Sequence, residues 1–283
     1  MVKLSACVIA KNEEASIGQW IDNMKGLANE MIVVDTGSTD RTVEIAKAGG
    51  AKTYFYAWQD DFSAAKNFAL SKASGDWILF LDADEYFSEE SLPRVRKEIE
   101  KYDKMRQVDG LVSYLTNIDM DMDNRIISTA FQMRIFRNRK YLRFVSKIHE
   151  YIENLLKRGK MGRLFIDLNI LHTGYTPRFM QDKLKRNLNM LQRQVDEKGI
   201  QAETYGYYID CYFGLNEYEK TIECVEKYMS QEKPSEEQRT TVYRRWIDSL
   251  LFAHRPEEEC LKAIETAIGD FPDMPEFALD KAR

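Results

Sequence analysis

The sequence predicts an α/β domain with a mainly parallel sheet, followed by a region built of helices. Over the first hundred residues, short buried-strand patterns alternate with helical patterns, which is the rhythm of a parallel sheet with helices on both faces. After Pro177 the strand patterns stop, and apolar residues recur at helical spacing. We therefore expect one domain over residues 1–175 and a helical region over residues 176–283.

The elements of the first domain follow in order along the chain. The run from Leu4 to Ala10 is compact and apolar, as in a strand covered on both faces. Further strands are expected at residues 31–35, 53–56 and 77–81, and a helix at 62–71. The helix that follows the second strand is expected to be capped by Thr39 or Asp40 and to end at Gly49–Gly50. Strand patterns at residues 111–115, 126–136 and 164–170 indicate that the sheet becomes mixed.

The helical region contains two similar blocks after a first helix over residues 178–198. They run over residues 205–229 and 242–271, each is a helix, a turn and a helix, and prolines (Pro234, Pro272) lie near their ends. The blocks loosely resemble tetratricopeptide repeats, which normally need about three units or a cap to be stable. We therefore expect these helices to pack on the first helix or on a second copy of the chain, as a homodimer.

Composition excludes several classes of protein. Among the 283 residues 44% are hydrophobic and 31% are charged, as in globular proteins. The net charge of -5 argues against a dedicated nucleic-acid binder. No apolar run reaches the about 18 residues that span a bilayer, and the N-terminus has no signal-peptide pattern. Four cysteines without a C-x-x-C pair are typical of reduced thiols, so we expect a cytoplasmic protein.

Polar clusters stand where three of the predicted strands end. They are Lys11–Glu13, Asp35–Ser38 and Asp82–Asp84. Ligands of open parallel sheets bind at the carboxyl ends of the strands, so we expect the three clusters to converge on one site.

Asp82-Ala83-Asp84 is the most informative of these clusters. Two carboxylates directly after a buried strand must be solvated, paired or metal-bound. Hard oxygen ligands suit Mg²⁺ or Mn²⁺, above all where phosphates complete the coordination shell. The alternative is a solvated acidic turn near a helix start.

Two further segments suit a phosphorylated ligand. In Asp35-Thr36-Gly37-Ser38-Thr39-Asp40, the glycine permits a tight turn and the following helix offers its N–H groups. In the segment from Trp58 to Asn67, Lys66 could neutralise diphosphate charge. Each segment could also be only a well-capped turn with a solvated lysine.

Together these segments resemble the family-two glycosyltransferases, which have the A-type nucleotide-diphospho-sugar transferase fold with a Rossmann-like mixed sheet. The matching pieces are residues 10–14, 32–40, 61–69 and 75–85, in matching order and spacing. The resemblance covers roughly residues 1–175. In particular, the chain looks like the bacterial subgroup with a tetratricopeptide-like helical tail, which includes glycosyltransferases of bacteriocin peptides.

The resemblance implies a set of site residues. The nucleotide-sugar would be bound by Ala10, Asn12, Glu13, Asp35, Lys66, Asp82, Ala83, Asp84 and His149. Within that set, Asp35 would hold the base or ribose. Asp84 would ligate a Mn²⁺ or Mg²⁺ ion, helped by His172 of the late element Leu171–Tyr175. Lys66 stands where relatives often carry arginine, so a compact ammonium replaces a planar guanidinium that could bind with two parallel hydrogen bonds.

Inverting family members need a carboxylate base that deprotonates the acceptor. Residues 144–150 resemble the segment of this subgroup that ends in His-Glu, and Glu150 is our first choice for the base. Three residues of an acidic loop are the alternatives: Asp119, Asp121 and Asp123.

Two other sets are open to a functional or a structural interpretation. Arg134 and Arg137 could face the diphosphate or acceptor, or form the polar face of a strand. Helical aromatics could line a peptide groove, although such spacing is more often repeat core; they are Tyr205, Tyr207, Tyr208, Tyr212, Tyr218 and Trp246.

The leading hypothesis is a metal-dependent inverting glycosyltransferase that takes a nucleotide-sugar, first of all a UDP-sugar, and a peptide or protein acceptor. One alternative acceptor is a cell-surface glycan or its lipid-linked precursor. Another alternative is a non-catalytic repeat adaptor with a degenerate transferase domain. A sugar-nucleotide pyrophosphorylase would open with a glycine-rich loop after the first strand, whereas this chain has no glycine before Gly18. The sequence leaves open the sugar, the acceptor atom and the oligomeric state.

Overall fold

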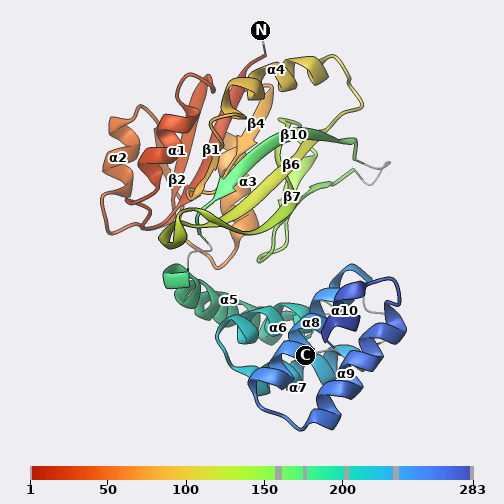
Figure 1. The fold of residues 1–283 in the computed structure, drawn as a ribbon. Coiled ribbons are helices and arrows are strands. Elements are labelled where there is room, and N and C mark those ends of the chain that lie inside the picture. Colours follow the sequence, from red (N-terminus) through yellow and green to blue (C-terminus); the bar gives the residue numbers. More distant parts are fainter. Residues whose placement is uncertain (1, 157–160, 175–176, 201–203, 232–235, 281–283) are drawn as a thin grey trace. The chain divides into compact units, whose positions relative to one another are not determined.

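The computed structural model describes residues 2–156, 161–174, 177–200, 204–231 and 236–280. The chain divides into two compact units, Met1–Pro177 and Arg178–Arg283. We call them the sheet unit and the helical unit, and both are drawn in Figure 1.

The sheet unit is built on one mixed sheet of eight strands in the order β3-β2-β1-β4-β7-β6-β10-β5. The half that comes first in the sequence is parallel, because β1 pairs in parallel with both β2 and β4, and β2 with β3. β7 is antiparallel to β4 and β6, which makes the sheet mixed. The strands are β1 (Leu4–Ala10), β2 (Glu30–Asp35), β3 (Lys52–Phe55), β4 (Trp77–Phe80), β5 (Glu85–Phe87), β6 (Gly110–Asp119), β7 (Arg125–Arg137) and β10 (Arg163–His172).

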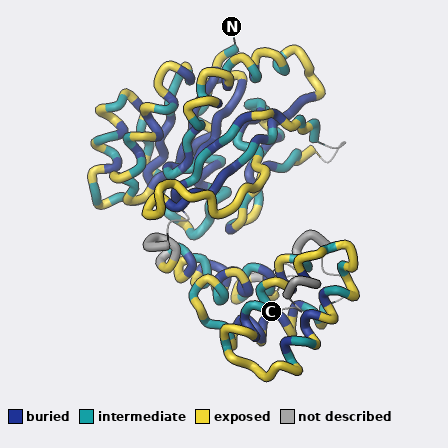
Figure 2. Tube along the Cα trace, in the orientation of Figure 1, coloured by how far each residue is buried: buried dark blue, intermediate teal, exposed yellow. Residues whose placement is uncertain are grey.

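Helices cover both faces of the sheet. On one face, the helices α1 (Ile17–Met24), α2 (Thr42–Ala48) and α4 (Leu92–Asp103) pack on a core that includes Trp20 and Trp77. On the other face, α3 (Phe62–Lys72) packs together with a small hairpin, β8 (Leu142–Val145) and β9 (Tyr151–Asn154). The buried residues form continuous runs along the central strands (Figure 2). The α/β class with an A-type mixed sheet is therefore confirmed.

The helical unit consists of α5 (Pro177–Lys198), α6 (Thr204–Gly214), α7 (Tyr218–Met229), α8 (Glu236–Phe252), α9 (Glu257–Asp270) and α10 (Pro275–Asp280). The pairs α6–α7 and α8–α9 are helix–turn–helix units, and α7, α8, α9 and α10 share one core around Tyr243 and Phe277. A Cβ on Gly214 would lie 2.6 Å from Leu184 Cδ1, so the glycine permits α6 to approach α5 closely. Among the described residues, no helix is long and apolar enough to cross a membrane.

Two features differ from the sequence-based expectation. Helix α2 begins at Thr42, and Arg41 before it makes no side-chain capping bond, so the expected cap is wrong for Thr39, whereas the Asp40 side chain does bind the first N–H of the helix. Asp40 accepts hydrogen bonds from the backbone N and the hydroxyl of Thr42, 3.0 and 2.5 Å away, which closes the turn before the helix. The sequence pattern gives no bounds for helix α4, because only Val95 and Ile99 of its twelve residues are buried hydrophobics.

Candidate active site

The loops after β1 and β2 are joined to each other by side-chain hydrogen bonds. Asn12 accepts a bond from Thr39 N at 2.8 Å through its Oδ1, and its own N–H donates to Ser38 Oγ at 2.9 Å. Asn12 has φ 57°, a left-handed conformation that asparagine tolerates better than most residues. Because β1 and β2 are parallel neighbours, these contacts bring two of the predicted polar clusters together.

Asp35 shapes the turn after β2. Its two carboxylate oxygens accept bonds from Gly37 N at 3.2 Å and Ser38 N at 3.0 Å, and the residue is buried. Gly37 has φ 111°, where a side chain would be strained. The side chain of Asp35, which is predicted to bind the ribose or base, is therefore held in one orientation at the strand end.

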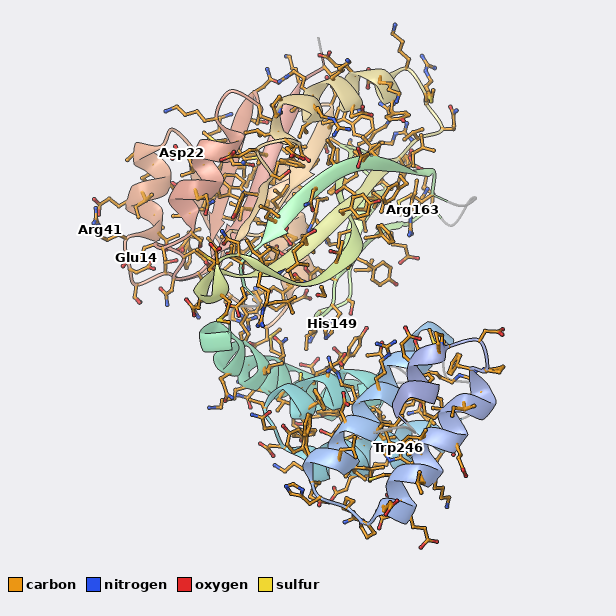
Figure 3. The ribbon with its side chains drawn as sticks, viewed as in Figure 1. Glu14, Asp22, Arg41, His149, Arg163 and Trp246 are labelled. Atoms are coloured by element: carbon orange, nitrogen blue, oxygen red, sulfur yellow. The ribbon has the colours of Figure 1, made fainter. Side chains whose placement is uncertain are left out.

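The remaining predicted residues of the β1 end also have defined partners. Ala10 O accepts from Thr36 N at 2.9 Å, and Glu13 Oε2 accepts from Ser16 Oγ at 2.6 Å. The neighbouring Glu14 accepts from Arg41 N at 3.0 Å, and both residues are labelled in Figure 3. These contacts fix the rim of the site beside Asn12.

Asp82, at the end of β4, lies in a network of charged side chains. Its Oδ1 is 2.8 Å from Lys66 Nζ, and its Oδ2 is 2.9 Å from an Arg134 nitrogen. Arg134 also pairs with Glu85, whose other oxygen accepts from Asp82 N at 3.0 Å. Lys66 Nζ makes a second ion pair with Glu150 Oε1 at 2.6 Å. The network thus connects Asp82, predicted to bind the nucleotide-sugar, to Glu150, the predicted base.

Burial and pairing set the protonation of this network. Burial alone would raise the pKa of Asp82, but Lys66 and Arg134 hold it well below its usual range. Burial raises the pKa of Glu85, and the attraction of Arg134 only partly opposes that rise. Burial would lower the pKa of Lys66, but Asp82 and Glu150 outweigh it and raise the value. Both cations therefore stay charged at neutral pH.

Asp84 and His172 lie together, as the two predicted metal ligands should. His172 Nε2 is 3.4 Å from Asp84 Oδ2, and His172 Nδ1 is 2.8 Å from Asn117 Oδ1. A contact of this kind at the second ring nitrogen orients ligating histidines in metalloproteins. Within the described residues no group of three or more Asp, Glu, His or Cys side chains is arranged so that it could hold a metal ion. One oxygen and one imidazole nitrogen fit Mn²⁺ or Mg²⁺ with phosphate oxygens as further ligands.

Glu150 and His149 belong to the segment between β8 and β9. Glu150 is partly buried, with 14% of its side chain exposed, whereas His149 is exposed and has φ 54°. His149 is labelled in Figure 3. Ala83 is buried between the two carboxylates of its motif. Tyr175, at the end of the late His-x-Gly-Tyr element, lies outside the described residues.

The acidic loop differs from Glu150 in its contacts. Asp119 is buried, caps the short 3₁₀ turn Met120–Met122 by accepting from Asp121 N, and lies 3.5 Å from Arg125. Asp121 and Asp123 are exposed. Asp119 thus pairs with Arg125, whereas Glu150 pairs with Lys66.

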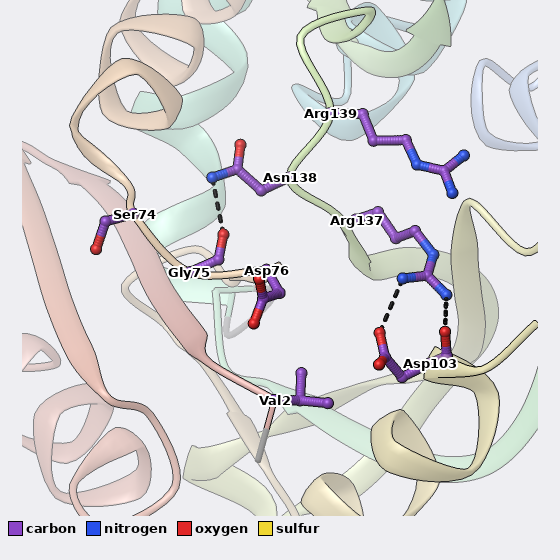
Figure 4. Close-up of a pocket in the computed structure, with 8 residues that line it drawn as sticks. All are labelled: Val2, Ser74, Gly75, Asp76, Asp103, Arg137, Asn138 and Arg139. Carbon is purple, nitrogen blue, oxygen red and sulfur yellow. Dashed lines mark hydrogen bonds and ion pairs between the residues drawn. The ribbon is translucent and has the colours of Figure 1, made fainter. Parts of the chain in front are cut away.

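Arg137 lies away from the predicted site. It pairs with Asp103 at 2.8 Å and stacks over Trp77, 4.5 Å from the ring centre. Arg137 and Asp103 border a polar hollow of ≈ 630 Å³ at the edge where β1 and β4 begin (Figure 4). Arg137 and its neighbour Arg139 both bond to backbone carbonyls and to carboxylates there, so this hollow is bounded by groups that already have partners.

The aromatic residues singled out in the helical unit are buried or half-buried. Tyr208 is buried and stacks on Tyr212 with ring centres 5.9 Å apart, and Trp246 lies against Tyr243. The other three of the set are half-buried: Tyr205, Tyr207 and Tyr218.

Sequence reasoning placed Arg134 on a strand but gave it no definite role, and it missed Glu85 altogether. Arg134 lies 52 residues from Asp82 in the chain, so no local pattern reveals the pair. A signal for Glu85 was present, because it directly follows the acidic motif and begins a strand.

Comparison with known proteins identifies the family. The model of glycosyl transferase family 2 matches residues 5–162, more than half of the chain. The chain belongs to this family.

Three relatives illustrate the range of similarity. A TPR repeat-containing protein of Synechococcus elongatus is 35% identical over 156 residues, which are 55% of this chain and 37% of that protein. The SPbeta prophage-derived glycosyltransferase SunS of Bacillus subtilis is 26% identical over 248 residues, 86% of this chain and 56% of that protein. An uncharacterized glycosyltransferase of Rickettsia typhi is 34% identical over 149 residues, 53% of this chain and 51% of that protein. The chain thus spans between about a third and somewhat over half of the length of these curated relatives.

A solved structure with partial similarity is glucosyl-3-phosphoglycerate synthase from Mycobacterium tuberculosis in complex with Mn²⁺ and uridine-diphosphate-glucose. It is 26% identical, with a TM-score of 0.35 over 40% of this chain and 44% of that chain.

Proposed function

We propose that this chain is a metal-dependent, inverting glycosyltransferase that moves a sugar from a UDP-sugar to a hydroxyl or thiol of a peptide or protein. The observation that carries the proposal is the network at the end of β4. There, Lys66 lies between Asp82 of the acidic motif and Glu150, while Asp84 faces His172. Family membership supports the transfer of a sugar. The residues of this network are suited to its two parts, which are binding of the donor and deprotonation of the acceptor.

On the donor side, Asp35 and Asn12 would hold the nucleoside at the ends of β1 and β2. Asp84 and His172 would hold a Mn²⁺ or Mg²⁺ ion, which would offset the charge of the departing diphosphate. Asp82 is fixed by Lys66 and Arg134, so it keeps one orientation beside that site.

On the acceptor side, Glu150 would take the proton of the attacking hydroxyl or thiol as the bond to the sugar forms. A general base must lie within hydrogen-bond reach of that proton and opposite the leaving group. Glu150 is partly buried and held by Lys66, whereas Asp121 and Asp123 are exposed. This difference in environment supports Glu150 as the base.

A peptide or protein acceptor is favoured over a glycan by the helical unit. Stacked helix pairs such as α6–α7 and α8–α9 commonly form binding surfaces for other polypeptides. Dimerisation through this unit and a cytoplasmic location stay predictions.

The test is thermal stabilisation by UDP, GDP, dTDP and CMP, each with and without Mn²⁺, on the wild type and on Asp84→Ala. A ligand that binds the folded state raises the melting temperature. We expect a Mn²⁺-dependent rise with UDP that Asp84→Ala abolishes. An increase in melting temperature with UDP that is the same with and without Mn²⁺ would contradict metal-dependent binding of the nucleotide. No increase with any nucleotide would favour the alternative of a non-catalytic adaptor.

A further inference from the structure

Lys66 lies in an environment unusual for a residue that contacts a soluble ligand. It is 1% exposed in the middle of α3. Its Nζ lies 5.2 Å from the ring centre of Phe80 and 5.4 Å from that of Phe144, distances at which an ammonium is attracted by an aromatic face. The ammonium is thus enclosed by rings and carboxylates of the protein itself.

The two carboxylates that Lys66 contacts come from opposite sides of the proposed reaction. Asp82 follows β4 on the donor side, and Glu150 precedes β9 on the acceptor side. Two like charges this close would repel each other, and one buried cation between them holds both at a fixed separation.

Helix α3 also holds the segment that carries Glu150. Asn67 Nδ2 donates to Phe144 O at 2.8 Å, and Phe144 N donates to Asn67 Oδ1 at 3.0 Å. At the start of the helix, Phe62 N donates to Lys147 O at 3.0 Å. Asn67 therefore binds the backbone at the start of this segment, and its neighbour Lys66 binds Glu150 at the end.

The segment itself has an unfavourable backbone. Ser146 has φ 74° and His149 has φ 54°, a region that residues other than glycine rarely adopt. Such conformations persist where the surrounding contacts determine them, and they cluster at functional sites. Removal of a contact from α3 should therefore loosen this segment first.

We propose that Lys66 is a positioning residue that sets the place of the base Glu150 relative to Asp82, and that it does not bind the diphosphate. The inference rests on the proposed function for the role of Glu150. The geometric part, that Lys66 holds residues 144–150 in place, stands on the contacts alone.

The experiment compares Lys66→Met with Lys72→Met in the full chain. Lys72 is a matched control, because it lies on the same helix and contacts the rings of Tyr54 and Phe68. Amide hydrogen exchange over residues 144–150 should rise about tenfold in Lys66→Met and stay unchanged in Lys72→Met. Lys66→Gln, which keeps a donor of hydrogen bonds, should show a smaller rise and serves if Lys66→Met does not fold.

Kinetics separates positioning from donor binding. The reaction followed is hydrolysis of UDP-glucose in the presence of Mn²⁺, in which water takes the glucose and UDP is released. We expect Lys66→Met to lower its kcat by about 100-fold, while the Kd for UDP changes by less than about threefold. In the Glu150→Gln background, Lys66→Met should cause no further loss of kcat, because residues that act through one another are not additive.

Unchanged exchange over residues 144–150 would overturn the proposal. So would a loss of UDP affinity as large as the loss of kcat, because Lys66 would then be a donor ligand. A wild type that neither binds nor turns over any nucleotide-sugar would contradict the proposed function, while the exchange comparison would still decide whether Lys66 holds the segment.

Discussion

At the scale of single residues, the site depends on how a few charges are paired. Both carboxylates are partly exposed, with 34% of the Asp82 side chain and 14% of the Glu150 side chain accessible; Lys66 pairs with both of them, and Arg134 pairs with Asp82 as well. In the proposed function, Asp82 would be a fixed part of the donor site because two cations hold it, and Glu150 would take the proton of the acceptor.

The role of Glu150 leads to a kinetic prediction. Glu150→Gln should lower kcat by about 10²–10³-fold, because a general base contributes that much to proton transfer. UDP affinity, measured by calorimetry, should change by less than about threefold. Glu153→Gln, a matched change on β9, should retain kcat, and an equal loss in both variants would contradict the assignment.

Glu30, at the start of β2, leads to a prediction of pH dependence. Burial would raise its pKa, but hydrogen bonds from Lys52, Ser74 and Ser5 lower it from 4.5 to about 2. A lowered carboxylate pKa stabilises the folded state at pH values above that of the unfolded chain, and this stability is lost as the pH falls through the folded value.

We therefore expect the wild type to lose stability between pH 4.5 and about 2 more steeply than Glu30→Gln. Solvent screens part of this carboxylate, so the difference in unfolding free energy between the two proteins should shrink by about 1–2 kcal/mol over that range. Urea titrations at several pH values measure it. Parallel curves for the two proteins would show that Glu30 is not the group involved.

Much of the candidate site could be predicted from residues that are near each other in sequence. Asp82 and Asp84 follow the buried strand β4, Asn12 follows its neighbour β1, and Asp35 follows β2 on the other side of β1. The topology alone therefore brings these residues to one edge of the sheet. Arg134 could not be assigned in this way, because its pairing with Asp82 depends on how β7 lies antiparallel beside β4. The enclosure of Lys66 likewise depends on Phe80 and Phe144, which are distant in sequence.

At the scale of elements, α3 connects the core of the sheet to the site. Its N-cap, Asp61, accepts a hydrogen bond from Ala64 N at 2.9 Å. The predicted start of this helix at Phe62 is confirmed, and its small residues Ala65 and Ala69 are buried against the sheet.

Loss of this cap should have a measurable cost. Asp61→Ala should lower the unfolding free energy by about 1 kcal/mol, because one N–H group of the first turn loses its partner. Asp61→Ser keeps a capping oxygen and should restore most of the loss. Denaturant midpoints at constant m-value measure both, and equal stability of Asp61→Ala and wild type would show that the cap contributes nothing.

The elements whose bounds the sequence did not predict are short or polar. β8 and β9 have four residues each, too few for a periodic pattern. In α4, charged residues surround a narrow apolar stripe, and Pro93 in its first turn looks like a breaker although proline is tolerated there. The long strands β1, β6, β7 and β10 were predictable because their apolar runs are extended.

At the scale of the whole molecule, each unit has a hydrophobic core of its own. Ile78 belongs to the core of the sheet unit, and Ile247 to that of the helical unit. Separate cores predict separate unfolding transitions.

Calorimetry tests this prediction. Ile247 is 1% exposed, so Ile247→Ala should lower the unfolding free energy of the helical unit by about 2–4 kcal/mol. It should leave unchanged the temperature of the other transition, which UDP and Mn²⁺ raise. Ile78→Ala should do the reverse. A single transition that both variants lower equally would contradict independent units.

In the proposed function, the network of Asp82, Lys66 and Glu150 supports inverting transfer from a UDP-sugar. The most direct measurement is proton NMR of the sugar first released when the wild type, with Mn²⁺, hydrolyses a UDP-α-sugar that stabilises it. Inversion predicts that the β-anomer forms first, before mutarotation, and that Glu150→Gln forms almost none. First formation of the α-anomer would contradict an inverting mechanism.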